Sequence, residues 1–396
     1  METLGLYIQI PFCASKCSFC NFSSRVARSN VYDNYCRALA REIESLPKIY
    51  QTAGMGSNIF ETPVGSIYMG GGTPSLLGSY RIERIIAELR RPFRFASNAE
   101  FTLEVTPGSA DKEFLERALK LGINRLSIGA QSFDNGELWP VGRLHSADDT
   151  RALIQAAHTE GFANISVDLI AGLPHQTETS WDASLHSAIA LEPAHISIYL
   201  FEIDEKSRLG SEVLRHGGRY HADAIPDEDF VADAYDRARE VLHQAGYLQY
   251  EISNFAFPGR ESVHNRKYWQ LKPYLGLGAG AHSSDGQFRW ENATSVEEYE
   301  RRLARGDSPV CEQRRLTADT QLEEFFFLGL RQLDGISLDE AEKRWGSEPI
   351  ERWTQKIESL ANDGWIERCN GRLRLAKRAL LVSNEIFQEF IDTSPV

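Results

Sequence analysis

Short apolar runs alternate with amphipathic stretches through the first half of the chain. Six of these runs have the length and the β-branched and aromatic content of strands, at residues 6–10, 66–69, 100–105, 125–128, 165–170 and 195–200. Apolar residues at helical spacing fill the stretches between them, at 31–46, 79–89, 112–121, 148–160 and 179–190. Strands that alternate with helices in this way predict parallel βαβ units. We therefore expect an α/β fold in which residues 1–245 form a partial (β/α)6 barrel.

Polar and glycine-rich residues follow the predicted strands one after another. A loop with three cysteines follows the first strand, and Gly-Gly-Gly-Thr-Pro at 70–74 follows the second. Glu104, Gln131 and Asp168 lie at or near the ends of the next three strands. The carboxyl ends of parallel barrel strands meet at one rim, where such barrels carry their active sites. The pattern therefore predicts a functional site at this rim.

A different pattern begins after residue 245. Residues 246–309 are rich in aromatic residues and glycine and end on the run Arg-Gly-Asp-Ser-Pro. Beyond them, apolar spacing and turn residues predict helices and then a hairpin, at 319–333, 338–345, 350–362 and 364–375. This order predicts a small α-rich, winged-helix-like C-terminal domain over residues 310–396. We expect that domain to pack or to dock a protein partner, because the acidic chain disfavours DNA binding.

Charge and hydropathy exclude several classes of protein. The 396 residues carry a formal net charge of −13, which argues against nonspecific nucleic-acid binding. No apolar stretch approaches the roughly 20 residues that a transmembrane helix needs. The first residues, Met-Glu-Thr-Leu-Gly-Leu-Tyr, enter a predicted strand and lack the basic region and cleavage signature of a signal peptide. We expect a cytoplasmic protein with no integral membrane segment.

Cys13, Cys17 and Cys20 form a C-x3-C-x2-C cluster directly after the first strand. Three thiolates with no fourth cysteine or histidine nearby can hold three irons of a [4Fe–4S] cube and leave the fourth iron open. A structural zinc site would need four ligands, and six cysteines in the whole chain are too sparse for a disulfide framework. The cluster therefore predicts a [4Fe–4S] centre whose open iron can bind a small molecule.

Four motifs together resemble the radical S-adenosylmethionine (SAM) superfamily, in the branch that contains oxygen-independent coproporphyrinogen III oxidase. They are the cysteine cluster, Gly-Gly-Gly-Thr-Pro-Ser at 70–75, Ile-Gly-Ala-Gln-Ser at 128–132 and Asp-Leu-Ile-Ala-Gly-Leu-Pro at 168–174. The resemblance implies a radical SAM barrel with SAM on the open iron. It also implies the SAM-binding residues, which are Phe19, Gly70, Gly71, Gly72, Thr73, Glu104, Gln131, Arg143 and Asp168.

The resemblance gives most of these residues a role. Glu104 would bind the amino group of SAM, and Arg143 would bind its carboxylate. Gln131 and Asp168 would bind the ribose hydroxyls. Phe19 would shield the cluster from water and help to seat the adenine. The glycines lack side chains, so the backbone could approach the methionine moiety closely.

A later stretch resembles the heme-chaperone branch of the same family. Its core is His-Asn-Arg-Lys-Tyr-Trp at 264–269, a motif that the resemblance associates with heme binding. Imidazole suits iron, so His264 is the expected axial ligand, and Tyr268 and Trp269 would border the macrocycle. His282 follows a glycine-rich run and is the candidate for a second heme ligand.

Two departures from the oxidase favour the chaperone branch. Phe22 stands where the oxidases carry a further cysteine, and the first strand begins within ten residues where they have an N-terminal extension. A third departure concerns both branches, because Gln9 replaces the histidine that they usually carry before Ile-Pro-Phe-Cys. Glutamine can donate and accept hydrogen bonds but cannot shuttle a proton near neutral pH.

Three functions stay open on the sequence. The first is a heme chaperone that binds heme, a [4Fe–4S] cluster and SAM and delivers heme to apo-hemoproteins. The second is an oxygen-independent coproporphyrinogen III oxidase, and the third is another radical SAM enzyme that modifies tetrapyrroles. We expect the first, with heme and apo-hemoproteins as partners, and leave open whether the chain is also an enzyme. A homodimer and a peripheral membrane contact are both compatible with this interpretation.

Overall fold

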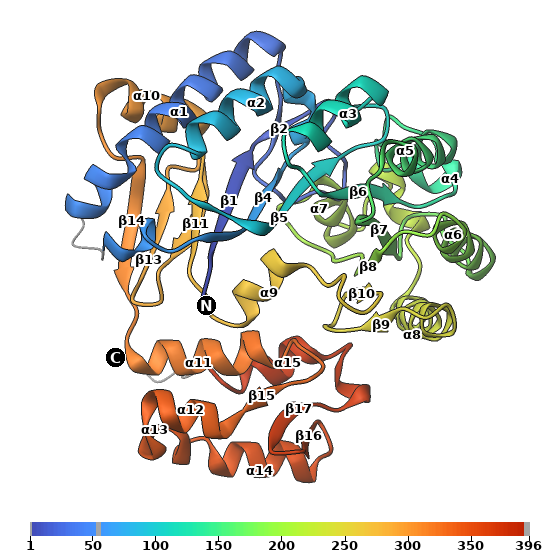
Figure 1. Ribbon diagram of the computed structural model, residues 1–396. Helices are drawn as coiled ribbons and strands as arrows, with labels where there is room; N and C mark the ends of the chain where they lie inside the picture. The colour runs from blue at the N-terminus through green and yellow to red at the C-terminus, as the bar shows by residue number, and fades with distance from the viewer. Residues whose placement is uncertain (1, 53–56, 392–396) are drawn as a thin grey trace.

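One curved sheet of twelve strands runs through the protein, whose computed structural model describes residues 2–52 and 57–391. The strand order is β14-β13-β12-β11-β1-β4-β5-β6-β7-β8-β10-β9 (Figure 1). Strands β14 and β9 lie at separate edges of this order, so the sheet is an open barrel. This arrangement confirms the expected α/β fold.

Six parallel strands form the middle of the sheet. They are β1 (Leu4–Ile10), β4 (Val64–Gly71), β5 (Phe95–Val105), β6 (Arg125–Gln131), β7 (Ile165–Ala171) and β8 (His195–Leu200). All six predicted strands are confirmed, and only β8 has the predicted bounds at both ends. Most positions of β1 and β7 are buried, as expected for parallel strands that are covered on both faces.

Five helices return the chain from one parallel strand to the next. They are α1 (Ser29–Thr52), α2 (Gly78–Leu89), α3 (Lys112–Lys120), α5 (Ala147–Glu160) and α6 (Glu178–Ala190), and they cover the outer face of the sheet (Figure 1). Side-chain caps fix three of their starts. Asp111 accepts a hydrogen bond from the Phe114 N–H, and Ser146 and Thr177 each belong to a capping box.

Shorter elements complete the connections. They are β2 (Phe12–Cys13), β3 (Arg25–Val26), the 3-10 turns Ser57–Phe60 and Pro74–Leu77, and α4 (Asn135–Leu138). After β8 come α7 (Arg208–Leu214), the 3-10 segment Arg219–Ala224 and α8 (Glu228–Gln244). The Asp227 side chain caps the start of α8, where it accepts a hydrogen bond from the Phe230 N–H. β9 (Leu248–Gln249) and β10 (Asn254–Ala256) then add antiparallel strands beside β8.

The aromatic and glycine-rich segment extends the same sheet at its other edge. After α9 (Val263–Trp269), β11 (Tyr274–Leu277) runs parallel to β1. β12 (His282–Ser284), β13 (Phe288–Asn292) and β14 (Val310–Arg315) continue antiparallel, with α10 (Val296–Arg305) between the last two. The sheet thus crosses the boundary expected at residue 245, and the three-part division of the chain stays a prediction.

A buried carboxylate ties this extension to the barrel. Glu42 of α1 accepts hydrogen bonds from the Gly278 N–H at 2.8 Å, from the Asn292 side chain at 2.6 Å and from the Tyr299 hydroxyl at 2.6 Å. Burial raises the pKa of Glu42 to about 7, although the three donors act in the opposite direction. One hydrogen-bonded carboxylate of α1 therefore holds three points of an extension that is far from it in sequence.

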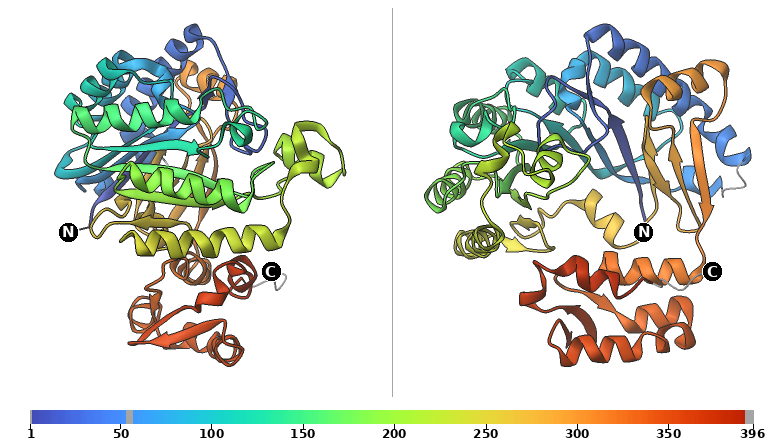
Figure 2. Two further views of the ribbon diagram at one scale, coloured as in Figure 1. Left: turned by 90° about the vertical axis from the view of Figure 1, so that its right-hand side faces the viewer. Right: turned by 180° about the vertical axis from the view of Figure 1, so that it is seen from behind.

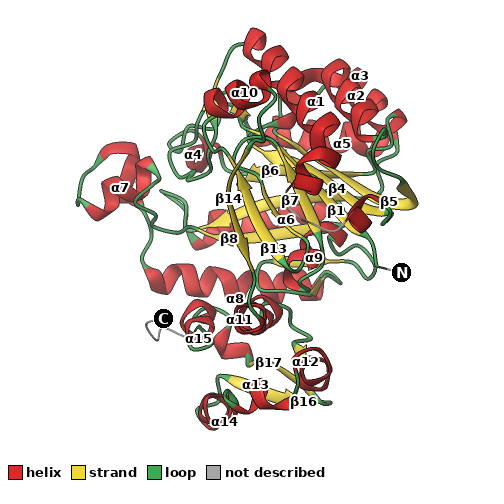
Figure 3. Ribbon diagram, turned by 90° about the vertical axis from the view of Figure 1, so that its left-hand side faces the viewer, coloured by secondary structure: helices red, strands yellow, loops and turns green. Residues whose placement is uncertain are grey.

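The C-terminal module, residues 318–388, packs below the sheet (Figures 1 and 2). It contains α11 (Ala318–Gly329), β15 (Ile336–Ser337), α12 (Leu338–Trp345), α13 (Ser347–Glu351), α14 (Thr354–Asn362), β16 (Ile366–Cys369), β17 (Arg372–Leu375), the 3-10 turn Lys377–Ala379 and α15 (Ser383–Gln388). The expected helices followed by a hairpin are confirmed (Figure 3). One difference is that the helix predicted at 350–362 is broken at Arg352 and Trp353, and the Trp353 ring packs on Phe326 and Phe390.

No helix in the described part of the chain is both long and apolar enough to cross a bilayer.

Candidate functional site

The cysteine loop, residues 13–22, lies at the rim formed by the C-terminal ends of the six parallel strands. Cys13 ends β2, which pairs with β3, and all three cysteine side chains are partly buried. Ser18 fixes the middle of the loop from two sides. Its N–H donates to the Val141 carbonyl at 2.9 Å, and its own carbonyl accepts from the Leu209 N–H at 2.8 Å. The loop is therefore held by the segments that follow β6 and β8.

Cys13 and Cys17 lie close enough to Cys20 to affect its protonation. Burial raises the pKa of the Cys20 thiol, and the neighbouring Cys17 and Cys13 raise it further. A guanidinium N–H of Arg143 points at the Cys17 sulfur from 3.5 Å. Among the described residues, no three His, Cys, Asp or Glu side chains gather closely enough to hold a single metal ion. The donor set of three free thiols fits an iron–sulfur cluster, in which each thiolate binds a different iron.

Gly70, Gly71 and Gly72 let the end of β4 pack tightly against its neighbours. A Cβ at Gly70 would lie 2.8 Å from a Glu104 oxygen, and a Cβ at Gly71 would lie 2.4 Å from the Gln9 side chain. At Gly72 it would lie 2.4 Å from the carbonyl oxygen of Phe12, immediately before the first cysteine. The glycines thus bring the rim carboxylate, Gln9 and the cysteine loop together. Their contact with SAM stays a prediction.

Thr73 follows these glycines and is buried. Its N–H donates to the Phe12 carbonyl at 2.6 Å, and its hydroxyl lies 3.3 Å from that of Thr106. The side-chain oxygen of Gln9 accepts a 2.7 Å hydrogen bond from the Tyr7 hydroxyl. The Thr73 backbone therefore holds the residue before Cys13, and its hydroxyl faces the end of the neighbouring strand β5.

Glu104 is a buried carboxylate at the end of β5. One oxygen accepts from the Tyr68 hydroxyl and the other from the Gly71 N–H, each at 2.9 Å. Burial raises the pKa of Glu104 to about 7, and the nearby Asp168 carboxylate contributes in the same direction. A cation bound beside this group would relieve the cost of its burial. That chemistry fits the ammonium group expected here.

Gln131, Arg143 and Asp168 each leave a buried polar atom without a partner among the described residues. These atoms are the Gln131 side-chain oxygen, the Arg143 Nε and the Asp168 Oδ1. Asp168 accepts a hydrogen bond from the Ser127 hydroxyl at 3.2 Å, and burial raises its pKa although neighbouring serine hydroxyls act to lower it. Arg143 also donates to the Gly129 carbonyl at 2.6 Å. Buried polar atoms normally have hydrogen-bond partners, so three unpartnered atoms at one rim are consistent with a site for a polar ligand.

Phe19 is held in place by neighbouring apolar side chains. Its ring packs against a small apolar cluster of Val141, Ile170, Leu173 and Leu209 beside the rim. This contact anchors the cysteine loop, and its expected role beside adenine stays a prediction. Phe22, by contrast, is 65% exposed at the end of the loop.

Arg125 and His195 are buried in the barrel interior and were not predicted from the sequence. Both ring nitrogens of His195 are engaged, with the Ser166 hydroxyl at 2.8 Å and the Tyr250 hydroxyl at 2.9 Å. The Arg125 charge acts to lower the pKa of Asp168. Arg125 starts a strand whose recognisable motif begins only at residue 128. Its inward direction follows from the pairing of β6 with both neighbours, which local sequence does not reveal.

The heme motif forms α9, at the opposite end of β1 from the cysteine loop (Figure 1). His264 is buried, with Nδ1 3.0 Å from the Ser66 hydroxyl and Nε2 2.8 Å from the Tyr268 hydroxyl. Burial lowers the pKa of His264 to about 3. Iron ligation by His264 would therefore replace one of these two hydrogen bonds. The Trp269 ring lies 6.1 Å from that of Tyr250.

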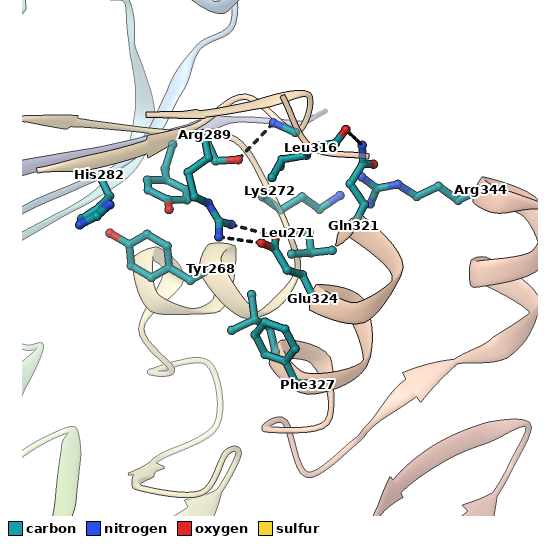
Figure 4. A pocket seen from close by; sticks show the side chains of 14 residues that line it. Tyr268, Leu271, Lys272, His282, Arg289, Leu316, Gln321, Glu324, Phe327 and Arg344 are labelled. Carbon is teal, nitrogen blue, oxygen red and sulfur yellow. Dashed lines mark hydrogen bonds and ion pairs between the residues drawn. The ribbon is translucent and has the colours of Figure 1, made fainter. Parts of the chain in front are cut away.

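His282 differs from His264 in its surroundings. It starts β12, and 58% of its side chain is exposed. It lines a pocket of about 320 Å³ together with Tyr268, and these two heme candidates are thus brought to one place (Figure 4). The structure therefore separates the predicted residues into a rim group around the cysteines and a second group at the far end of the sheet.

Comparison with known families covers most of the chain. The Radical SAM superfamily profile matches residues 7–188, and the profile of the HemN C-terminal domain matches residues 316–382. The coproporphyrinogen III oxidase HemN of Escherichia coli, a radical SAM enzyme, superposes with a TM-score of 0.84 over 98% of this chain and 90% of its own. Its sequence is 24% identical, so this likeness shows a shared fold.

Curated relatives match over nearly the full length. The heme chaperone HemW of Bacillus subtilis is 33% identical, over 97% of this chain and 98% of its own. HemW of Escherichia coli is 30% identical, over 99% of both chains. A mitochondrial protein of Bos taurus, radical S-adenosyl methionine domain-containing protein 1, is 35% identical over 71% of this chain and 60% of its own. The chain therefore belongs to the radical SAM superfamily and, within it, to the family of the heme chaperone HemW.

Proposed function

We propose that this protein is a heme chaperone, which binds heme and passes it to apo-hemoproteins, and that it also holds a [4Fe–4S] cluster and SAM. The observation that carries the proposal is the likeness to HemW of Bacillus subtilis, 33% identical over 97% of this chain. Both the barrel and the C-terminal module take part in that likeness. A function inferred from a relative is better supported when the likeness covers every element that could form the site.

The rim residues support the cluster and SAM. Cys13, Cys17 and Cys20 are the thiolates that would hold the cluster, and SAM bound to it would supply one-electron chemistry. Glu104 would bind the amino group of SAM through one of its two carboxylate oxygens. These oxygens accept hydrogen bonds from the Tyr68 hydroxyl and the Gly71 N–H. The unpaired atoms of Gln131, Arg143 and Asp168 would satisfy the ribose hydroxyls and the carboxylate.

The oxidase alternative has less support. Phe22 offers no thiol at the position where the oxidases carry a further cysteine, and the likeness to HemN shows the fold alone. The same rim could nevertheless host a radical reaction, so the two functions need a direct comparison.

The test is an anaerobic titration of heme into cluster-reconstituted protein, followed at the Soret band, with later addition of apomyoglobin as acceptor. A saturable, stoichiometric Soret change and transfer of the heme to apomyoglobin are expected. Absence of saturable binding would overturn the proposal. In parallel, coproporphyrinogen III is incubated with the protein, SAM and a reductant, and formation of protoporphyrinogen IX would establish the oxidase instead.

A further inference from the structure

A pocket of about 320 Å³ lies where the sheet extension meets the C-terminal module. We call it the junction pocket. Its walls come from the turn after α9, from β11 to β13 and from α11 and α12, so three separate parts of the sequence build it (Figure 4). Ligand pockets commonly lie between domains and span about 300–1,000 Å³. Its size and place are therefore those of a ligand site.

The two ends of the junction pocket differ in chemistry. His282 and Tyr268 lie at one end, and the cationic side chains of Lys272 and Arg344 extend toward the other (Figure 4). Apolar side chains of α11, Phe327 among them, line the wall between. A ligand that fits all three features has an apolar body, can be bound by an imidazole and carries acidic groups along one edge.

The His282 imidazole is available to a ligand. Its nearest carboxylate oxygen, on Glu291, lies 3.8 Å from Nε2, which is beyond hydrogen-bonding distance. His264, by comparison, uses both ring nitrogens in hydrogen bonds to Ser66 and Tyr268. Neutral imidazole with a free nitrogen is the form that binds iron. Of the two candidate heme ligands, His282 is the one that can bind iron without breaking a hydrogen bond recorded for its ring.

The cationic end is only partly neutralised. Lys272 pairs with Glu2 at 3.2 Å on the surface, a contact that solvent screens. The Arg344 guanidinium stacks on Trp345 at 4.5 Å from the ring centre, and no carboxylate of the described residues lies within ion-pair distance of it. Guanidinium groups bind carboxylates through two parallel hydrogen bonds. This end is thus suited to the carboxylates of a ligand.

The floor of the junction pocket contributes no net charge. Arg289 of β13 and Glu324 of α11 form a two-bonded ion pair, at 2.7 and 2.9 Å, and Glu324 is buried. The opposite charges of this pair cancel, so the excess positive charge of the pocket comes from Lys272 and Arg344. The pair also joins the sheet to the C-terminal module, which fixes the width of the pocket.

We propose that the junction pocket is the heme site of this protein, with His282 as axial ligand and with Lys272 and Arg344 holding the propionates. The inference rests on the proposed heme-binding function and adds the place of binding. Heme carries its iron at the centre of an apolar macrocycle and two propionates on one edge, which matches the order of groups along the pocket.

This site also separates heme from the radical SAM rim. His264 lies against Gly5 near the start of β1, and the cysteines follow the end of that strand. Five strand residues at about 3.3 Å each put roughly 16 Å between Gly5 and Ile10 alone. The junction pocket lies on the Gly5 side, because Lys272 pairs with Glu2. Heme bound in this pocket is therefore carried out of reach of the cluster and SAM at the rim.

The test compares anaerobic heme titrations of the cluster-reconstituted protein with those of His282→Ala and of Lys272→Gln/Arg344→Gln. Both changes are at exposed side chains, so iron content and circular dichroism should match the wild type. His243→Ala, at an exposed histidine on α8, is the matched control.

His282→Ala should change the Soret position and weaken heme binding by roughly tenfold or more, and the double variant should weaken it without moving the Soret band. Wild-type binding that both variants retain in full would overturn this location and leave the chaperone function intact. Loss of heme binding in His243→Ala alone would also overturn it. No saturable binding by the wild type would overturn both proposals.

Discussion

The backbone N–H of Gly71 donates a 2.9 Å hydrogen bond to the buried carboxylate of Glu104. This bond joins the ends of β4 and β5 at the rim, where the glycine run and the cysteine loop meet. The structure thus holds an acidic group in a place where burial disfavours its charge, with a pKa of about 7 in place of the ordinary 4.5. A buried carboxylate whose charged form is disfavoured in this way is suited to binding a cationic ligand.

Glu104→Gln should make the ligand-free protein more stable at high pH. Between pH 4.5 and about 7 the folded protein holds a proton on Glu104 that the unfolded chain has released, so wild-type stability falls as pH rises through this window. Glutamine has no such proton. The difference in free energy of unfolding, variant minus wild type, should grow by about 2 kcal/mol between about pH 5.5 and about pH 8, measured by urea unfolding.

The same substitution should weaken SAM binding, because it removes the negative charge expected to hold the amino group. A loss of roughly tenfold in affinity is expected by equilibrium dialysis with the reconstituted protein. Glu44→Gln, an exposed glutamate on α1, should change neither quantity. A flat pH dependence of the stability difference would contradict the assigned pKa, and unchanged SAM affinity would remove Glu104 from the site.

Gly72→Ala should destabilise the protein by about 3 kcal/mol. The new Cβ would lie 2.4 Å from the Phe12 carbonyl oxygen and 2.9 Å from that of Ile10, and both are backbone atoms that cannot rotate away. Because Phe12 precedes Cys13, iron content should fall as well. Gly218→Ala is the control, since a Cβ there would meet nothing within 4 Å and should change stability by less than about 1 kcal/mol. Thermal unfolding and iron analysis of both variants measure the difference.

The barrel could be predicted because its signals are local. Each parallel strand is a short apolar run whose neighbours are amphipathic helices, and the rim residues follow those runs directly. The added strands β11 to β14 were not predicted, because their short sequences mix glycine, serine and charged residues. Gly276 illustrates the reason. A Cβ there would lie 2.1 Å from the His282 carbonyl oxygen, a requirement that appears only when β11 and β12 pair with each other.

The rim group could be predicted further than the heme group for the same reason. Cys13, Cys17 and Cys20 are close in sequence, and spacing alone indicates their chemistry. Lys272 and Arg344, by contrast, meet in the junction pocket from segments separated by the whole of α10 and α11. The motif in the sequence favours His264 over His282, and the burial of His264 and its hydrogen bond with Ser66 become visible only in the folded chain.

Cys17→Ala should abolish the cluster and leave a folded barrel. The side chain is one of three thiols at the rim, and Arg143 is the only group that an evident hydrogen bond connects to it among the described residues. Iron analysis after anaerobic reconstitution should fall well below the about four irons per chain of a complete cluster. Cys311→Ala, at an exposed cysteine of β14, should retain full iron content. Near-complete iron in Cys17→Ala would refute the assignment of this ligand.

Glu324→Ala should loosen the C-terminal module from the sheet. The substitution leaves Arg289 partly buried without its carboxylate, and its Nε already lacks a partner among the described residues. Removing one member of a buried pair costs about 3 kcal/mol or more, because the remaining charge is not solvated. Urea unfolding followed by tryptophan fluorescence measures the loss, because Trp345, Trp353 and Trp365 lie in the module and the other four tryptophans lie outside it.

The double variant Arg289→Met/Glu324→Leu should recover most of that loss, because it removes both charges and keeps apolar volume at the contact. Glu358→Ala, at an exposed glutamate of α14, should stay within about 0.5 kcal/mol of the wild type. If the single and double variants were equally unstable, packing rather than charge would hold the module in place. Heme affinity should follow the same order, since the ion pair fixes the distance between the two walls of the junction pocket.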